Sequence, residues 1–361
     1  MPVLTTNINW DFIVDKIMEE KCVLVLGPNA MTRGNGKTIQ EDMLEFLDID
    51  NNSNLLKYYP NDDFFLFDDA GGSTLTCHRI KRFFDQQQPP EILKKIARIP
   101  FHVILNFTPD QLLPQAFNQQ QIQHQFDFYK RHLEPSSIVT PSKSLPLVYN
   151  MLGSIADEES VVLTYDDLFD YFSSVFSRKS MPDKLKVELK GAKNFIFLGV
   201  PFDKWYVQLL LRILDINRQQ YAFKRYASNQ ALSNEVQTFC IEQFKIDFVS
   251  KRIPEFIDKI YQLCENKQLL RMESSQHESE LDKIKFLIAT GNLEQPILLL
   301  QDYLKGKNNE LYNEILGVGG RYRRLQRKVQ VGAIDPKEEA TNLNQITDNL
   351  LELVDETKAL E

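Results

Sequence analysis

Runs of apolar residues that stop at Gly or Asn recur along the first two thirds of the chain. The first, Cys22–Leu26, is followed by Gly27, and similar runs end at Asn106 and Gly199. Uninterrupted aliphatic runs of this length are typical of strands buried on both faces of a parallel sheet. Segments of helical period separate them. The alternation predicts an α/β fold with a doubly wound, mostly parallel sheet, whose further strands lie near residues 146–149, 161–164, 221–223 and 246–249.

The loop after the first strand is the first candidate for binding chemistry. Gly27, Pro28 and Asn29 lead into a polar segment at 31–37 and a predicted helix at 41–46. In open α/β sheets such a loop brings backbone N–H groups to a nucleotide phosphate. An ordinary strand-to-helix turn explains the same residues, because Pro28 has no N–H and a G-x-G-x-x-G pattern is absent.

Two segments of the N-terminal part lack a clear period. Residues 48–69 are rich in Asn, Asp and aromatic residues, and such an insert often forms a lid or a partner surface. The Gln-rich stretch 115–125 is predicted as the solvated end of a helix. The remaining helices are predicted at 8–18, 75–84, 91–97, 168–176, 201–214 and 233–244.

The C-terminal part has a different pattern. From residue 278 onwards apolar residues recur in steps of three and four, in four segments, which predicts a small helical bundle. The domain boundaries follow: a nucleotide-binding domain at 1–265, a polar linker at 266–277 and a helical adaptor at 278–361. Three glycines at 317, 319 and 320 either allow close helix approach or break the third helix.

A basic run from Arg321 to Lys328 follows these glycines. Such a run forms a solvated helix face or docks on an acidic partner helix. With the docking interpretation, charge reversal at Arg323 and Arg327 is expected to abolish association.

Composition narrows the possible functions. A length of 361 residues favours two domains, and a formal charge of −8 argues against nucleic-acid binding as the main role. No apolar run reaches membrane-spanning length, so we expect a cytoplasmic protein without a membrane partner. Four separate cysteines indicate buried thiols in a reducing compartment. The five histidines show no metal-ligand spacing, so no metal is expected.

Four blocks of the N-terminal part resemble a known family. They are Asn106–Leu113, Leu152–Ile155, Leu163–Asp167 and Phe197–Trp205, and they follow the loop at Gly27. In this order they resemble the sirtuin-like NAD-binding domain of prokaryotic defence proteins, over about residues 20–265. The resemblance implies a Rossmann-like sheet that binds NAD in a crevice at the carboxyl ends of its strands.

The same resemblance implies which residues would act. Active members carry an Asn and a His where this chain has Thr108 and Leu152, whereas Asp110 keeps its family position. Cleavage of the nicotinamide–ribose bond would then fall to Asp110, with Asn106 as a second candidate if the strand end bulges. A carboxylate that caps the following helix explains Asp110 equally well. The residues expected to contact the nucleotide are Gly27, Pro28, Asn29, Asn106, Phe107, Thr108, Asn150, Gly199 and Phe202.

The C-terminal part has a resemblance of its own. Thr290–Leu293, Gly320–Leu325 and the closing Leu-rich helix resemble the helical effector-associated domains of bacterial conflict systems. This implies partners that carry a homologous domain, including a second copy of the chain. Two functions follow: an effector that binds and hydrolyses NAD when activated through this domain, or a catalytically inactive sirtuin-like scaffold or nucleotide sensor.

Overall fold

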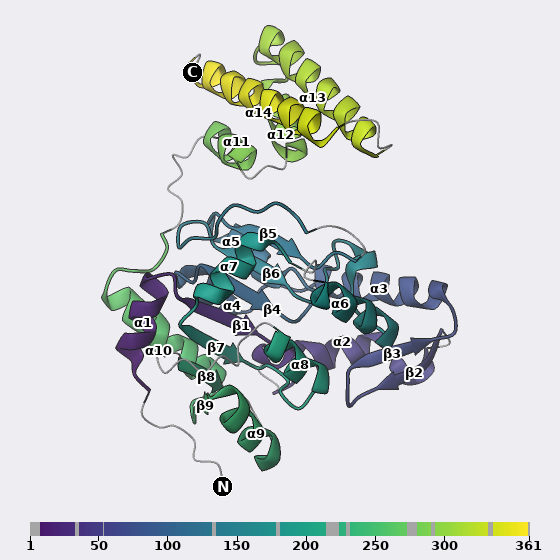
Figure 1. The fold of residues 1–361 in the computed structure, drawn as a ribbon, viewed down its shortest axis with the longest axis vertical. Helices are drawn as coiled ribbons and strands as arrows, with labels where there is room; N and C mark the ends of the chain where they lie inside the picture. Colours follow the sequence, from purple (N-terminus) through teal and green to yellow (C-terminus); the bar gives the residue numbers. More distant parts are fainter. Residues whose placement is uncertain are drawn as a thin grey trace. The chain divides into compact units, whose positions relative to one another are not determined.

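The structure is a computed structural model and divides into two compact units (Figure 1). The head comprises Met1–Ser136 and Thr140–Glu273, and the tail comprises Ser274–Glu361 with Ser137–Val139. The structure describes residues 8–32, 36–52, 54–131, 135–177, 181–213, 224–228, 232–272, 280–289, 293–330 and 335–359.

A seven-stranded sheet forms the centre of the head, in the order β5-β6-β4-β1-β7-β8-β9. Every neighbouring pair is parallel, which confirms the predicted doubly wound α/β class. β1 lies in the middle, and all five of its residues are buried, as expected for an aliphatic run covered on both faces. The strands are β1 (Cys22–Leu26), β4 (Val103–Asn106), β5 (Gln125–Phe128), β6 (Leu147–Asn150), β7 (Asn194–Leu198), β8 (Lys224–Ser228) and β9 (Ile246–Phe248).

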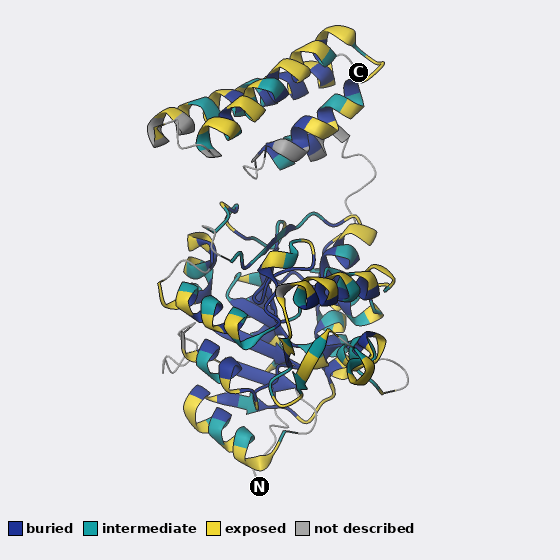
Figure 2. Ribbon diagram, turned by 90° about the vertical axis from the view of Figure 1, so that its right-hand side faces the viewer, coloured by how far each residue is buried: buried dark blue, intermediate teal, exposed yellow. Residues whose placement is uncertain are grey.

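Helices flank the sheet and present their apolar faces to it (Figures 1 and 2). The helices are α1 (Trp10–Met18), α2 (Ile39–Leu47), α3 (Ala70–Asp85), α4 (Glu91–Arg98), α5 (Leu112–Gln119), α6 (Tyr165–Phe176), α7 (Asp183–Gly191), α8 (Trp205–Ile213), α9 (Asn234–Phe244) and α10 (Ile253–Asn266), with single 3-10 turns η1 (Pro28–Ala30), η2 (Ile49–Asn51) and η3 (Glu158–Ser160). α2 and α6 begin with capping boxes, at Thr38 and Thr164.

Three segments of the head differ from the sequence-based expectation. The insert contains an antiparallel hairpin, β2 (Leu55–Tyr59) and β3 (Phe64–Phe67), rather than irregular chain. The Gln-rich stretch does not continue as helix: α5 ends at Gln119, and Gln125 begins a strand because Gln125 and Asp127 face inward. The run at 161–164 is not a strand: its apolar side chains are buried, and its backbone bonds to Leu152 O and the Phe65 N–H outside the seven-stranded sheet. The strand expected at 221–223 lies outside the described residues.

The head extends beyond residue 265. Leu269 and Leu270 pack on the head core, and Arg271 is buried. The Arg271 guanidinium donates to the carbonyl oxygens of Ala97, Ile99, Phe101 and Lys143. The first residues of the expected linker at 266–277 are therefore part of the head, and residues 273–277 lie outside the described chain.

The tail contains the four helices that the periodicity predicts. They are α11 (Glu280–Ala289), α12 (Glu294–Leu304), α13 (Asn309–Gln330) and α14 (Pro336–Ala359), and they enclose a core of their own. α13 runs unbroken through its glycines. A Cβ on Gly319 would lie 3.1 Å from Cγ2 of Ile297, so this glycine permits close approach to α12. Among the described helices, none has the length and apolar character needed to cross a membrane.

Candidate functional site

The site lies where the chain changes direction across the sheet. β4 pairs with one edge of β1 and β7 with the other, so the loops after these three strands meet at their carboxyl ends. Ligands of open α/β folds bind at such a switch point. The sequence placed Gly27, Phe107 and Gly199 in these three loops, and the sheet order brings the loops together.

The loop after β1 packs against the loop after β7. The N–H of Gly27 donates to Leu198 O at 2.9 Å, and that of Asn29 donates to Gly199 O at 3.2 Å. The N–H of Ala30 donates to Gly27 O, and Pro28 has no N–H. A Cβ on Gly27 would lie 2.2 Å from Gly199 O. These contacts favour the ordinary turn over a phosphate cradle, because the glycine serves close packing and the donors are already bonded.

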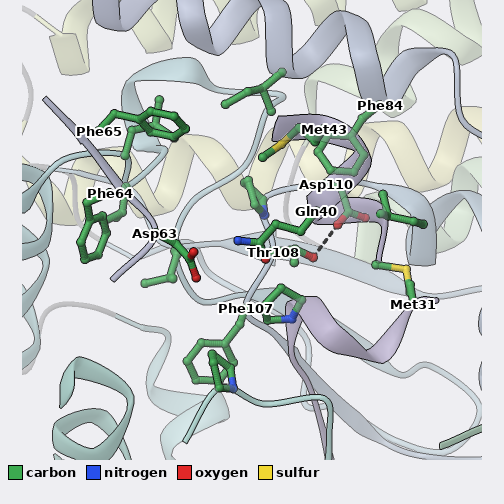
Figure 3. Close-up of a pocket in the computed structure, with 18 of the residues that line it drawn as sticks. Met31, Gln40, Met43, Asp63, Phe64, Phe65, Phe84, Phe107, Thr108 and Asp110 are labelled. Carbon is green, nitrogen blue, oxygen red and sulfur yellow. Dashed lines mark hydrogen bonds between the residues drawn. The ribbon is translucent and has the colours of Figure 1, made fainter. Parts of the chain in front are cut away.

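A pocket lies beside this loop, between α2, α3, the β2–β3 hairpin and the loops after β4 and β6 (Figure 3). Most of its wall is apolar. The lining residues are Pro28, Met31, Ile39, Gln40, Met43, Asp63, Phe64, Phe65, Ile80, Phe84, Phe107, Thr108, Pro109, Asp110, Leu152, Val162, Leu163, Pro201 and Tyr206. A largely apolar concave surface with a few polar groups is the usual form of a small-molecule site.

Two asparagines behind the pocket hold the loop after β4. Asn106 Nδ2 donates to Thr108 O at 3.0 Å and to Asn150 Oδ1 at 3.1 Å. Asn150 Nδ2 donates to Asp110 O at 2.8 Å. Both side chains are buried, and neither lines the pocket. The strand does not bulge to present Asn106, whose amide instead fixes the loop.

Thr108 and Asp110 carry the polar chemistry at the base of the pocket (Figure 3). Asp110 is 1% exposed, and its Oδ1 accepts the N–H of Leu112, the first residue of α5, at 2.8 Å. Its Oδ2 is hydrogen-bonded to the Thr108 hydroxyl, which also lies 3.0 Å from Asn106 Oδ1. Burial raises the pKa of Asp110, although the bonds from Thr108 and Leu112 oppose the shift.

The β2–β3 hairpin forms the opposite wall and is tied down by a buried lysine. Lys204 Nζ donates to Pro60 O at 3.1 Å and Asn61 O at 2.6 Å, and lies 3.2 Å from Asp63 Oδ2. Asp63 also accepts the Tyr58 hydroxyl at 2.7 Å. The hairpin turn therefore has a fixed position above the pocket.

The expected site residues fall into four groups. Pro28, Phe107, Thr108 and Asp110 line the pocket, whereas Gly27, Asn29 and Gly199 pack the loops beneath it. Asn106 and Asn150 form the network behind it. Phe202 is a core residue, fully buried between Phe197 and Phe248.

Sequence reasoning missed the hairpin and α2 as walls of the pocket. The aromatic residues of the insert were the available signal, because an exposed irregular loop would not need Phe64 and Phe65. Nothing in the sequence marked Met31, Met43 or Gln40 as residues of a pocket.

Histidine and cysteine chemistry lies elsewhere in the described chain. His78 pairs with Glu158, His124 stacks on Phe117, and His102 is buried, which lowers its pKa to about 4. None of these three lines the pocket. The four cysteines are buried and free. The described residues contain no cluster of three or more His, Cys, Asp or Glu side chains that could hold a metal ion. His132 and His277 lie outside them.

Two family models match the chain. The SIR2-like domain matches residues 105–248, and Effector-associated domain 11 matches residues 279–358. The first match begins in β4 and ends in β9, so it contains the loop with Thr108 and Asp110 but not α2 or the hairpin. No curated protein matches the chain. The chain therefore combines a SIR2-like head with an effector-associated tail, as the sequence blocks predicted, and SIR2-like domains generally bind NAD.

Proposed function

We propose that this chain, which joins a SIR2-like domain to an effector-associated domain, is a defence-type effector component that binds an NAD-type nucleotide without hydrolysing it by itself. The tail would assemble it with proteins that carry a like domain. One observation supports this proposal above the others. The pocket lies at the switch point of the sheet, and the polar groups at its base are already bonded to one another.

The chemistry of the pocket suits the nicotinamide end of the ligand. A nicotinamide ring has two flat apolar faces and one carboxamide, which needs both a donor and an acceptor. Phe64, Phe65 and Phe107 offer apolar walls, and Gln40 and Asp63 offer polar atoms at the side of the pocket. Since the loop after β1 has no spare N–H at Gly27, Asn29 or Ala30, the phosphates would have to bind nearer the mouth.

The same geometry argues against hydrolysis by the head alone. Breaking the nicotinamide–ribose bond requires a group that positions or activates water close to the sugar. Thr108 and Leu152 stand where active relatives carry Asn and His, and the Asn106 amide is bonded through its Nδ2 to Thr108 and Asn150. No histidine lines the pocket in the described chain.

The burial and position of Asp110 support a second candidate function, that of an NAD hydrolase that becomes active on assembly. It is the buried carboxyl that lines the pocket, and its raised pKa is a feature of acid–base groups in active sites. To stabilise a developing oxocarbenium ion, the carboxylate would have to leave the Leu112 N–H and the Thr108 hydroxyl.

Calorimetry with a matched pair of variants tests the binding proposal. Met43 lines the pocket from α2, whereas Phe46 on the same helix is 39% exposed and does not line it. Met43→Trp should fill the pocket and abolish binding of NAD, while Phe46→Trp should bind as the unchanged chain does. Failure of NAD, ADP-ribose and nicotinamide to bind the unchanged chain would refute the proposal.

A further inference from the structure

The seam between α13 and α14 forms a groove along the tail. The two parts of this groove meet at Arg321 and Asn349, which line both. Its ends carry opposite charge: Glu314, Glu352 and Glu356 line the acidic end, and Arg321, Arg324 and Lys328 line the basic end. All six side chains are exposed, whereas the apolar floor, which includes Val318 and Leu325, is buried.

The two charged ends do not neutralise each other within one chain. Glu314 and Lys328 are fourteen positions apart on one helix, which is about 21 Å at 1.5 Å per residue and exceeds the screening length in physiological salt. Among the described residues, no ion pair engages any of the six charges. With the Asn349 amide oxygen turned toward it, Arg321 donates to Asn349 at 3.0 and 3.2 Å, which fixes the guanidinium beside the groove.

The groove is open to close approach at Gly317. Gly317 lines the part of the groove that carries the glutamates, between Glu314 and Arg321, and a Cβ placed there would meet nothing within 4 Å. A second backbone can therefore come near α13 at this point. Arg323 and Arg327, which the sequence suggested as docking residues, are exposed but do not line the groove.

We propose that two copies of this chain pair in antiparallel fashion through this groove. A two-fold axis near Arg321, midway along α13 between Glu314 and Lys328, places the acidic end of each copy on the basic end of the other. An isologous interface requires such a self-complementary surface, and the separated charges supply it. This inference rests on the assembly role proposed for the tail, and it names the surface and the symmetry.

Charge reversal in the full chain tests the pairing by sedimentation equilibrium. The first variant reverses the basic end with Arg321→Glu, Arg324→Glu and Lys328→Glu. The second reverses the acidic end with Glu314→Lys, Glu352→Lys and Glu356→Lys. Each variant alone should dimerise at least ~100-fold more weakly than the unchanged chain, because every cross-interface pair becomes repulsive. An equimolar mixture of the two should form heterodimers, because each end again faces the opposite charge.

The control variant carries Arg323→Glu and Arg327→Glu and should dimerise as the unchanged chain does. Three results would overturn the inference: a monomeric unchanged chain at every concentration, open-ended association instead of a dimer, or a mixture of reversed variants that stays monomeric. NAD calorimetry on the same samples keeps the two proposals separable. An unchanged chain that binds NAD but does not pair refutes the groove alone, and an unchanged chain that pairs but does not bind NAD refutes the proposed function of the head.

Discussion

The pocket of the head and the groove of the tail use polar groups in opposite ways. At the base of the pocket and behind it, Thr108, Asp110 and Asn106 are buried or half-buried and bonded to one another. Along the groove the charged groups are exposed and have no ion-pair partner among the described residues. Removing one of a set of hydrogen-bonded buried groups leaves its partners unsatisfied and lowers the free energy of unfolding substantially. Exposed charges contribute little to that free energy. This difference fits the ligand that we propose for the head and the separate, salt-sensitive partner that we propose for the tail.

The largest difference in the free energy of unfolding should appear when one arginine of the head and one of the tail are each replaced by methionine. Arg271→Met removes a buried guanidinium that donates to four carbonyl oxygens, so the free energy of unfolding should fall by about 3–5 kcal/mol. Arg324→Met removes an exposed cation and should change it by less than about 0.5 kcal/mol. Urea unfolding measures both values. Equal losses would remove the contrast.

Truncation sharpens the same contrast. A chain that ends at residue 265 loses Arg271 and the packing of Leu269 and Leu270, whereas a chain that ends at 276 keeps them. We expect the shorter head to be unfolded or strongly destabilised and the longer one to unfold cooperatively. Circular dichroism during thermal unfolding separates the two outcomes, and two equally stable heads would show that the boundary at 265 was adequate.

Asp110 should show the next largest effect, together with a dependence on pH. Asp110→Ala leaves the Leu112 N–H and the Thr108 hydroxyl without this partner and should cost about 1–3 kcal/mol. Asp110→Asn keeps an oxygen for Leu112 and supplies an N–H toward Thr108, so it should be much less costly. Urea unfolding of the two variants at pH 7 compares them, and equal losses would contradict the importance of these two hydrogen bonds.

The pKa of Asp110 is raised in the folded state, so this group favours folding at low pH and loses that contribution as pH rises through its folded pKa. The stability of the unchanged chain relative to Asp110→Asn should therefore decline from pH 4 toward neutrality. Paired urea titrations across that range measure the difference. A relative stability that rises with pH would contradict the raised pKa.

Lys204 tests whether the hairpin positions the ligand. Lys204→Met breaks the bonds to Pro60 and Asn61 and the pair with Asp63, so the wall that carries Phe64 should loosen. We expect about tenfold weaker NAD binding, equivalent to roughly 1.4 kcal/mol. Lys186→Met, which removes an exposed pair with Asp183 on α7, serves as the control. Equal affinities in calorimetry would mean that the hairpin does not shape the site.

Added salt should change ligand binding by the head only slightly and should clearly weaken association through the tail. Raising the ionic strength screens exposed charges but reaches a buried pocket weakly. Tail-dependent dimerisation should weaken progressively with added sodium chloride, while nicotinamide binding should change less than about twofold. Sedimentation and calorimetry in the same buffers measure both. Parallel salt dependences would show that the two sites do not differ in this way.

Much of the fold followed from patterns that depend on local residues alone. The buried runs at β1, β4 and β7 and the four tail segments are periodic enough to specify their elements. The run at 161–164 looked like a strand because its residues are apolar, yet these residues are buried without joining the sheet. Gln125 was assigned to a solvated helix end because composition does not show which neighbours will cover a side chain.

The candidate site was less predictable than the fold. The loop after β4 could be identified from the sequence because Asp110 follows a predicted strand and carries a carboxyl group. Asn106 seemed available for catalysis because a sequence cannot show that its amide is bonded to Thr108 and Asn150. The pairing of Lys204 with Asp63 depends on two elements that meet only in the folded head.

The fate of NAD mixed with the full chain distinguishes binding from hydrolysis. The full chain is incubated with NAD and passed through a desalting column. NAD and nicotinamide are then quantified in the protein fraction and in the later fraction that contains the free small molecules. We expect intact NAD in the protein fraction of the unchanged chain, none with Met43→Trp, and no nicotinamide above the protein-free control. Release of nicotinamide that is lost in Asp110→Asn would contradict this expectation and establish the head as an NAD hydrolase.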